Sequence, residues 1–198
     1  MASVVCNATF RLSNGELVDM SSTVVEGTAT ELLTSTVYSV SAVSIGQYAE
    51  GKTLVEIVQP PSCPNSISWA YINRRGSILC ALPVAVEGVQ SAPCPMPRPV
   101  TLEAGDTIEV MASTSSNRRF GLSVITNQGV HAIFDGTPSG SGNTDLTHIL
   151  SGQGLGASLT NQRIVAHWAT SIDGSKITSA GGAYYLNDRG LQIGRAHV

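Results

Sequence analysis

Short runs rich in Val, Ile, Thr and Tyr recur throughout this sequence, and turn-forming residues separate them at intervals too short for helices. The run Val4–Leu12 is followed by Ser13-Asn14-Gly15, whose Asn-Gly pair is a strong hairpin signal. No stretch longer than two helical turns carries the apolar period of an amphipathic helix. The pattern predicts an all-β chain that folds as an antiparallel β-sandwich, jelly-roll-like, with at most one or two short helical turns.

The remaining strand signals continue this pattern. Thr36–Ile45 and Thr53–Val58 alternate in side-chain type, and Pro60-Pro61 is expected to end pairing because proline has no amide donor. Two further hairpins are expected from Ile67–Ile72 with Ser77–Val86, and from Arg119–Thr126 with Val130–Phe134. Asn143 or Thr144 is expected to cap one helical turn that runs to Leu150.

Apolar residues on the expected inward faces of these strands define the predicted core. Both tryptophans lie in the middle of strand signals, where core packing is favoured over a sugar-binding platform. The residues expected to be largely buried are Trp69, Ile72, Leu79, Leu82, Ile108, Val110, Leu122, Val124, Ile133, Val165 and Trp168.

Charge is unusually sparse in this chain. Charged residues make up 13% of the sequence, against about 25% in an average globular protein. The formal net charge is −3 and the arginines form no basic stripe, so there is no strong signal for nucleic-acid binding. Arg74-Arg75 and Arg118-Arg119 are interpreted as solvated or inter-subunit side chains. No apolar run approaches the ~20 residues of a spanning helix, so no membrane span is expected.

No combination of residues predicts an active site. Gly152–Gly156 lacks the flanking strand and helix that a phosphate-binding loop needs, and is interpreted as a flexible loop. The spacing of His131, His148 and His167 does not match a metal-binding motif, and Asp135 is expected in a turn. The chain is therefore expected not to be an enzyme, with no catalytic, cofactor-binding or metal-binding residues.

The four cysteines, Cys6, Cys63, Cys80 and Cys94, include no Cys-x-x-Cys pair, so a zinc site is not favoured. Buried free thiols are the favoured interpretation. A Cys80–Cys94 or Cys63–Cys80 disulfide stays open for an oxidising environment.

Residues 1–191 are expected to form a single β-sandwich domain, because all-β folds often fill this length as one unit. Residues 192–198, Gln-Ile-Gly-Arg-Ala-His-Val, resemble the translation of a sequencing-library adapter. They are interpreted as a non-native tail and excluded from fold reasoning.

The segment Val100–Val110 places a Gly105-Asp106 turn between a short strand and an alternating one. This pattern resembles a hairpin of viral jelly-roll capsid and virion structural proteins, and of trimeric tumour-necrosis-factor-like heads. The resemblance covers about a tenth of the chain, and it implies a structural virion protein, a capsid or capsid-surface subunit, that acts by self-assembly. The alternative is the receptor- or glycan-binding head of a fibre-like protein. Because the N-terminus has no signal-peptide pattern, the expected location is the virion, after synthesis in the host cytoplasm.

Assembly contacts, rather than a pocket, are expected to carry this function. The expected partners are copies of the chain itself and other virion proteins. Two segments are the candidates: a proline-rich connector, Ser91–Pro99, and a glycine-rich loop, Gly136–Gly156. The candidate interface residues in them are Pro93, Pro95, Pro97, Pro99, Gly140, Gly142 and Gly154. The open alternatives are a rigid internal crossover for the first segment and a disordered surface loop for the second.

Overall fold

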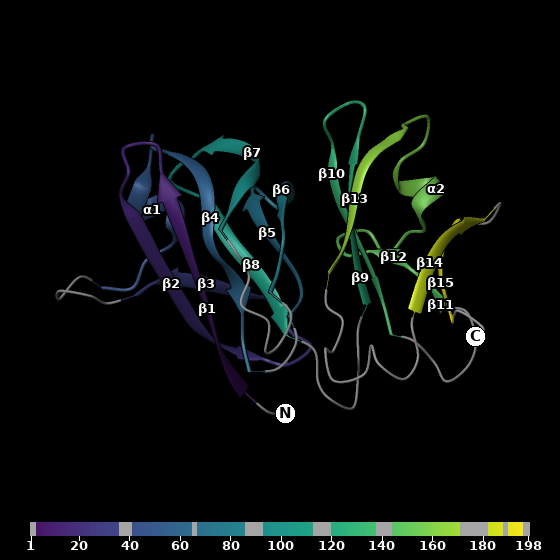
Figure 1. Cartoon of the computed structure of the whole chain (residues 1–198), viewed down its shortest axis with the longest axis horizontal. Helices are drawn as coiled ribbons and strands as arrows, with labels where there is room; N and C mark the ends of the chain where they lie inside the picture. Colours follow the sequence, from purple (N-terminus) through teal and green to yellow (C-terminus); the bar gives the residue numbers. More distant parts are fainter. Residues whose placement is uncertain are drawn as a thin grey trace.

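The computed structural model describes residues 3–35, 41–64, 67–85, 93–112, 120–137, 144–170, 182–187 and 190–195. Their strands pair antiparallel throughout and form three sheets, accompanied by two short helices, α1 (Ile45–Ala49) and α2 (Leu155–Ser158) (Figure 1). The predicted all-β antiparallel class is therefore confirmed.

The first sheet contains eight strands in the order β6-β5-β8-β3-β2-β1-β4-β7. Their bounds are β1 (Ser3–Leu12), β2 (Leu17–Val25), β3 (Thr30–Thr34), β4 (Thr53–Ser62), β5 (Ile67–Arg74), β6 (Ser77–Leu82), β7 (Cys94–Thr101) and β8 (Thr107–Ala112). The sheet curls until its two outer strands, β6 and β7, come close together. Across this seam the Arg98 guanidinium of β7 donates to the carbonyl oxygen of Leu79 on β6. The result is a nearly closed barrel.

Every second side chain along a barrel strand points inward, and these side chains fill the core of the barrel. In β1 every second residue, from Cys6 through Ala8 and Phe10 to Leu12, is buried, because successive side chains of a strand point to opposite faces. These residues pack against Leu54, Ile57, Ile72, Ile108 and Val110 from other strands of the same sheet.

The second sheet has the order β12-β10-β9-β13, with β9 (Phe120–Thr126), β10 (His131–Gly136), β12 (Thr147–His148) and β13 (Ile164–Thr170). One face packs on its own small core, which includes Phe120, Leu122, Val124 and Phe134. A third sheet joins β11 (Thr144–Asp145), β15 (Gly190–Arg195) and β14 (Gly182–Asn187).

The second sheet lies beside the outer face of the barrel (Figure 1). Trp69 and Tyr71 of β5, Ala81 of β6 and Ile133 of β10 form a buried cluster between the two sheets. Ile78, Met111, Ile149 and Trp168 pack against it and are partly buried. This contact between sheets is called the sheet junction below.

Most of the predicted core is confirmed, since all but three of its members are buried. Leu79 and Trp168 are only partly buried. Val165 was predicted wrongly, because its side chain is 54% exposed. The pairing of β13 with β9 shifts register between Ile164 and Ala166, so Val165 lies at an irregularity of the strand and faces solvent, while Ile164 and Trp168 pack inward.

Several local predictions are corrected by the structure. Most of Ser91–Pro99 is not a connector but β7, one of the two outer strands of the sheet, where proline is tolerated. Pro60-Pro61 lies within β4, whose pairing with β1 continues past it to Ser62 after a register shift. Residues 41–44 are irregular and Ile45 begins α1, while 36–40 lie outside the described residues. Neither β2 nor β3 was predicted from the sequence.

The described part of the glycine-rich region, residues 144–156, contains regular secondary structure. The predicted helical turn before Leu150 is replaced by β11 and β12, and a single helical turn, α2, follows Gly154. Residues 192–195, interpreted as a non-native tail, lie within β15 and pair with β14. No helix in the described ranges is long and apolar enough to cross a membrane.

Candidate functional site

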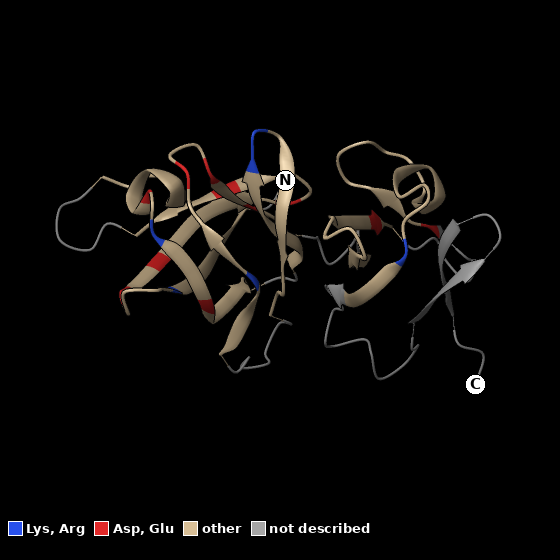
Figure 2. Cartoon of the chain, turned by 90° about the horizontal axis from the view of Figure 1, so that it is seen from above, with Lys and Arg blue, Asp and Glu red and all other residues tan. Residues whose placement is uncertain are grey.

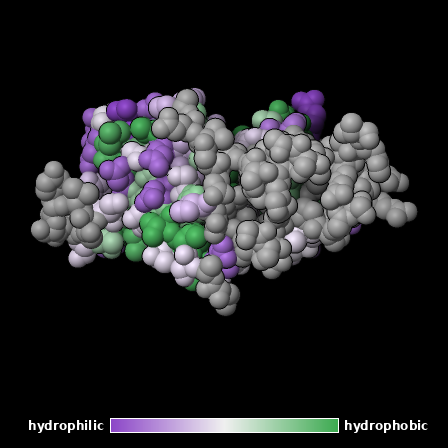
Figure 3. All heavy atoms as spheres, turned by 60° about the horizontal axis from the view of Figure 1, so that its bottom comes forward, coloured by the Kyte–Doolittle hydropathy of each residue, from purple (hydrophilic) through white to green (hydrophobic). Residues whose placement is uncertain are grey.

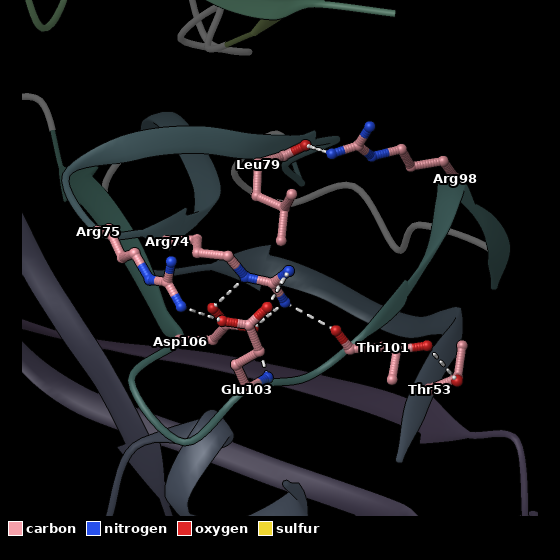
Figure 4. Close-up of polar contacts among 8 residues, drawn as sticks. All are labelled: Thr53, Arg74, Arg75, Leu79, Arg98, Thr101, Glu103 and Asp106. Atoms are coloured by element: carbon pink, nitrogen blue, oxygen red, sulfur yellow. Dashed lines mark hydrogen bonds and ion pairs between the residues drawn. The ribbon is translucent and has the colours of Figure 1, made fainter. Parts of the chain in front are cut away.

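A cluster of charged side chains joins two turns at one end of the barrel (Figure 4). Arg74, at the end of β5, donates from Nε and Nη2 to the two carboxylate oxygens of Asp106, at 2.8 and 2.6 Å. Arg74 also pairs with Glu103 at 2.9 Å and donates to the carbonyl oxygen of Thr101 at 2.7 Å. Asp106 is fully buried and accepts a further hydrogen bond from the backbone amide of Glu103.

This arrangement makes the Gly105-Asp106 turn a structural anchor. The bidentate pair with Asp106 raises the pKa of the Arg74 guanidinium. Arg74, which was expected to be solvated or inter-subunit, is therefore held within the chain. Arg75 is largely exposed and reaches the other carboxylate oxygen of Glu103. The cluster satisfies its own charges, so its geometry favours stability over ligand binding.

Two side chains form hydrogen bonds with backbone groups on the free edge of β6. Leu79 and Ala81 present backbone groups on the same side of the strand, because amides two residues apart point in the same direction. The Leu79 carbonyl oxygen accepts from Arg98 (Figure 4), and the Ala81 amide donates to Nδ1 of His131 at 3.2 Å. Burial, and then the nearby charge of Arg98, lower the pKa of His131 to about 4. His131 is therefore neutral at pH 7 and acts as an acceptor.

The sheet junction contains a buried carboxylate. Asp135 of β10 accepts a hydrogen bond from the indole Nε1 of Trp69 at 3.0 Å, and both side chains are buried. The expectation of a turn position for Asp135 is therefore wrong: the residue lies in a strand, and its carboxylate points to the barrel. The Trp69 ring also packs on Tyr71, with ring centroids 5.5 Å apart.

The outer edge of β13 differs from the other edges of the two larger sheets. Among the described residues β13 pairs only with β9, so its second row of amides and carbonyls faces no strand. Its sequence, Ile-Val-Ala-His-Trp-Ala-Thr, contains no proline and no Lys, Arg, Asp or Glu. By contrast, three prolines interrupt the row of amides in β7, and Arg98 and His131 bind backbone groups on the edge of β6. The remaining edge strand, β12, is two residues long. The open edge of β13 is the candidate functional site.

Few charged residues surround this edge. Residues 120–170 include three, Asp135, Asp145 and Arg163, where an average sequence of this length would have about a dozen. Figure 2 shows that the Lys, Arg, Asp and Glu of the described residues lie mainly on the barrel. The second sheet therefore presents a largely neutral surface.

Two polar groups near β13 have no hydrogen-bond partner within the described part of the chain. They are the Ser123 hydroxyl of β9 and the indole nitrogen of Trp168, and these two residues pair directly across the strands. The indole nitrogen is covered although the Trp168 side chain as a whole is only partly buried.

The predicted interface residues that the structure describes lie at two separate places. Pro95, Pro97 and Pro99 lie in β7 of the barrel, and Pro93 directly precedes it. Gly154 precedes α2, beside the second sheet. Gly140 and Gly142 lie outside the described residues. An assembly role for these seven residues stays a prediction.

The histidines weighed for a metal site have other contacts. His148 packs edge-on against the ring of Phe134, with centroids 5.4 Å apart, and its Nδ1 lies 3.2 Å from the Ser151 hydroxyl. Within the described ranges, no group of three His, Cys, Asp or Glu side chains is placed to hold a metal ion.

No protein-family model, curated protein or solved structure matches the chain.

Proposed function

We propose that this protein is a structural virion subunit, in the capsid or on its surface, that acts by self-assembly, and that β13 forms one of the contacts between copies. The open, uncharged edge of β13 is the observation that carries this proposal. An exposed strand edge offers unpaired amides and carbonyls to another chain, and proteins that stay monomeric usually protect such edges.

A second copy of the chain suits this edge. Two β13 strands related by a two-fold axis would pair antiparallel and extend the second sheet across both subunits. The strand carries no Lys, Arg, Asp or Glu, so this pairing brings no like charges together. Val165, on β13, is half exposed and would be covered.

The low charge of the second sheet supports the same proposal, because the centres of protein interfaces are depleted in charged residues. Exposed apolar atoms alone are weaker support. Figure 3 shows hydrophobic patches on the barrel. Leu17, on β2 of the barrel, is about as exposed as Val165. The combination of an open edge with low charge distinguishes β13.

The assignment to a virion rests on the resemblance of Val100–Val110 to jelly-roll virion proteins. It also rests on strands rich in Ser, Thr and Val, whose low charge suits surfaces that neighbouring subunits cover.

Sedimentation velocity across a concentration series tests assembly. Large closed particles, or dimers that build into larger species, are expected. A protein that stays monomeric at every concentration contradicts self-assembly, and a trimer that does not grow favours the alternative of a fibre head.

Val165→Lys tests the contact itself. The new charge sits on an exposed position of β13, so the fold should persist while pairing between copies weakens. Leu17→Lys is the matched control, since Leu17 is 50% exposed but lies on the barrel. Equal assembly of both variants would show that β13 is not the contact.

A further inference from the structure

Two cysteines that lie 57 positions apart in the sequence face each other in the barrel. Strands β1 and β4 pair antiparallel, with Asn7 opposite Ser62. One step further in this register brings Cys6 of β1 opposite Cys63, the residue that follows β4. Directly opposed residues of antiparallel strands have Cα atoms about 4.5–5.5 Å apart, within the range that a disulfide bridges.

The surroundings of the two thiols agree with this placement. Cys6 is fully buried in the barrel core, and Cys63 packs against the same core while keeping partial exposure. The two side chains contact each other through a hydrogen bond. That contact, together with burial and with charge on Cys63, raises the pKa of Cys6 well above its ordinary value. Cys6 therefore stays protonated, and Cys63 is the thiol that solvent reaches.

We propose that Cys6 and Cys63 form a disulfide when the folded protein meets a low-molecular-weight disulfide such as oxidised glutathione. The bond would fasten β1, a central strand of the barrel, to the end of β4. Neither bridge considered from the sequence includes this pair. Cys80 is placed differently, because its thiol contacts the carbonyl oxygen of Ala81 at 3.6 Å.

The reaction proceeds by two thiol–disulfide exchanges. The Cys63 thiolate attacks one sulfur of the small disulfide, which forms a mixed disulfide and releases one small thiolate that takes up a proton. The Cys6 sulfur then attacks the Cys63 sulfur, the second small thiolate leaves, and this thiolate takes up the proton that Cys6 gives up. In total, two protein thiols become one disulfide and one small disulfide becomes two thiols.

Peptide mapping of the oxidised protein tests the pairing. The folded protein is treated with oxidised glutathione, remaining thiols are blocked, and trypsin is applied without a reductant. A Cys6–Cys63 bond links the peptide of residues 1–11 to that of residues 53–74. Because trypsin does not cleave between Arg98 and Pro99, Cys80 and Cys94 share the peptide of residues 76–118. A Cys63–Cys80 bond would therefore link different peptides, and a Cys80–Cys94 bond would link none.

Thermal unfolding supplies the second measurement. A bond that closes so long a loop should raise the melting temperature of the oxidised protein by about 5–15 °C. Cys63→Ser should abolish this shift and leave the reduced protein nearly unchanged, because Cys63 is only partly buried. Cys94→Ser, which alters another partly buried cysteine, should keep the shift. Absence of the linked peptides 1–11 and 53–74 from the folded, oxidised protein would overturn the proposal, as would an equal shift in Cys63→Ser.

Discussion

The indole Nε1 of Trp69 donates a hydrogen bond to Oδ2 of Asp135, and this bond crosses from the barrel to the second sheet. The two residues are 66 positions apart and both are buried. A buried carboxylate is costly unless donors surround it, so the bond also helps to set where the second sheet sits on the barrel. That position decides which edge of the second sheet faces outward.

Trp69→Phe tests this bond. Phenylalanine keeps an aromatic ring but removes a donor to Asp135, so the variant should lose about 1–3 kcal/mol of unfolding free energy. Denaturant unfolding of Trp69→Phe, Asp135→Asn and the double variant measures the coupling between the two residues. Strictly additive losses would show that the bond does not contribute.

Asp106→Asn tests the anchor at the end of the barrel. The change leaves the Arg74 guanidinium without its bidentate partner at a buried site, and a loss of about 3 kcal/mol is expected. Arg75→Ala is the control: Arg75 is 85% exposed, and its pair with Glu103 should contribute less than about 0.5 kcal/mol. Similar losses in the two variants would contradict the view that burial, rather than the number of ion pairs, sets their importance.

Gly46 lies where α1 meets the turn before β8. A Cβ built there would be 2.2 Å from the Glu103 carbonyl oxygen and 2.6 Å from the Asp106 amide nitrogen, and both are backbone atoms. Gly46→Ala should therefore cost about 1–3 kcal/mol, although alanine favours helix by about 1 kcal/mol. Gly156→Ala in α2, where a Cβ meets nothing within 4 Å, should be neutral or stabilising. Calorimetry compares the two, and an equal effect would rule out the close approach as the cause.

Glu31 and Glu109 lie directly opposite each other on β3 and β8. Burial, and then the charge of Glu109, raise the pKa of Glu31, so the folded state holds this proton more tightly than the unfolded state. Stability from this site therefore falls as pH rises through the folded pKa. At pH 7, Glu31→Gln should stabilise the protein by about 0.5 kcal/mol, since opposed like charges are unfavourable. The gain should vanish at acidic pH, and a gain that does not depend on pH would exclude the charge pair as its source.

The sequence predicted features that depend on near neighbours. The Asn14-Gly15 turn and the burial of Trp69 follow from local patterns, and the structure confirms both. The proline-rich β7 was missed because its pairing depends on a place at the edge of a sheet, which local sequence does not reveal. The contacts of Asp135 and His131, and the contact between Cys6 and Cys63, depend on register between distant strands. Among the described residues β13 has one neighbouring strand, β9, and that depends on the order of strands distant in sequence, so no local pattern could identify it.

His131 makes the stability of the sheet junction depend on pH. As a neutral acceptor it binds the Ala81 amide, and burial followed by the charge of Arg98 lowers its pKa from 6.5 to about 4. Between these values the unfolded state binds a proton that the folded state does not, so unfolding free energy decreases as pH falls from 6.5 towards 4. One pKa unit corresponds to about 1.4 kcal/mol, and because the folded state is itself half protonated at its pKa, the loss by pH 4 is on the order of 3 kcal/mol. His131→Gln offers a neutral acceptor that does not titrate, so denaturant unfolding of this variant should depend less on pH over the same interval. If the variant and the parent protein lose stability in parallel over that interval, other groups cause the acid sensitivity, and His131 does not control the β6 edge.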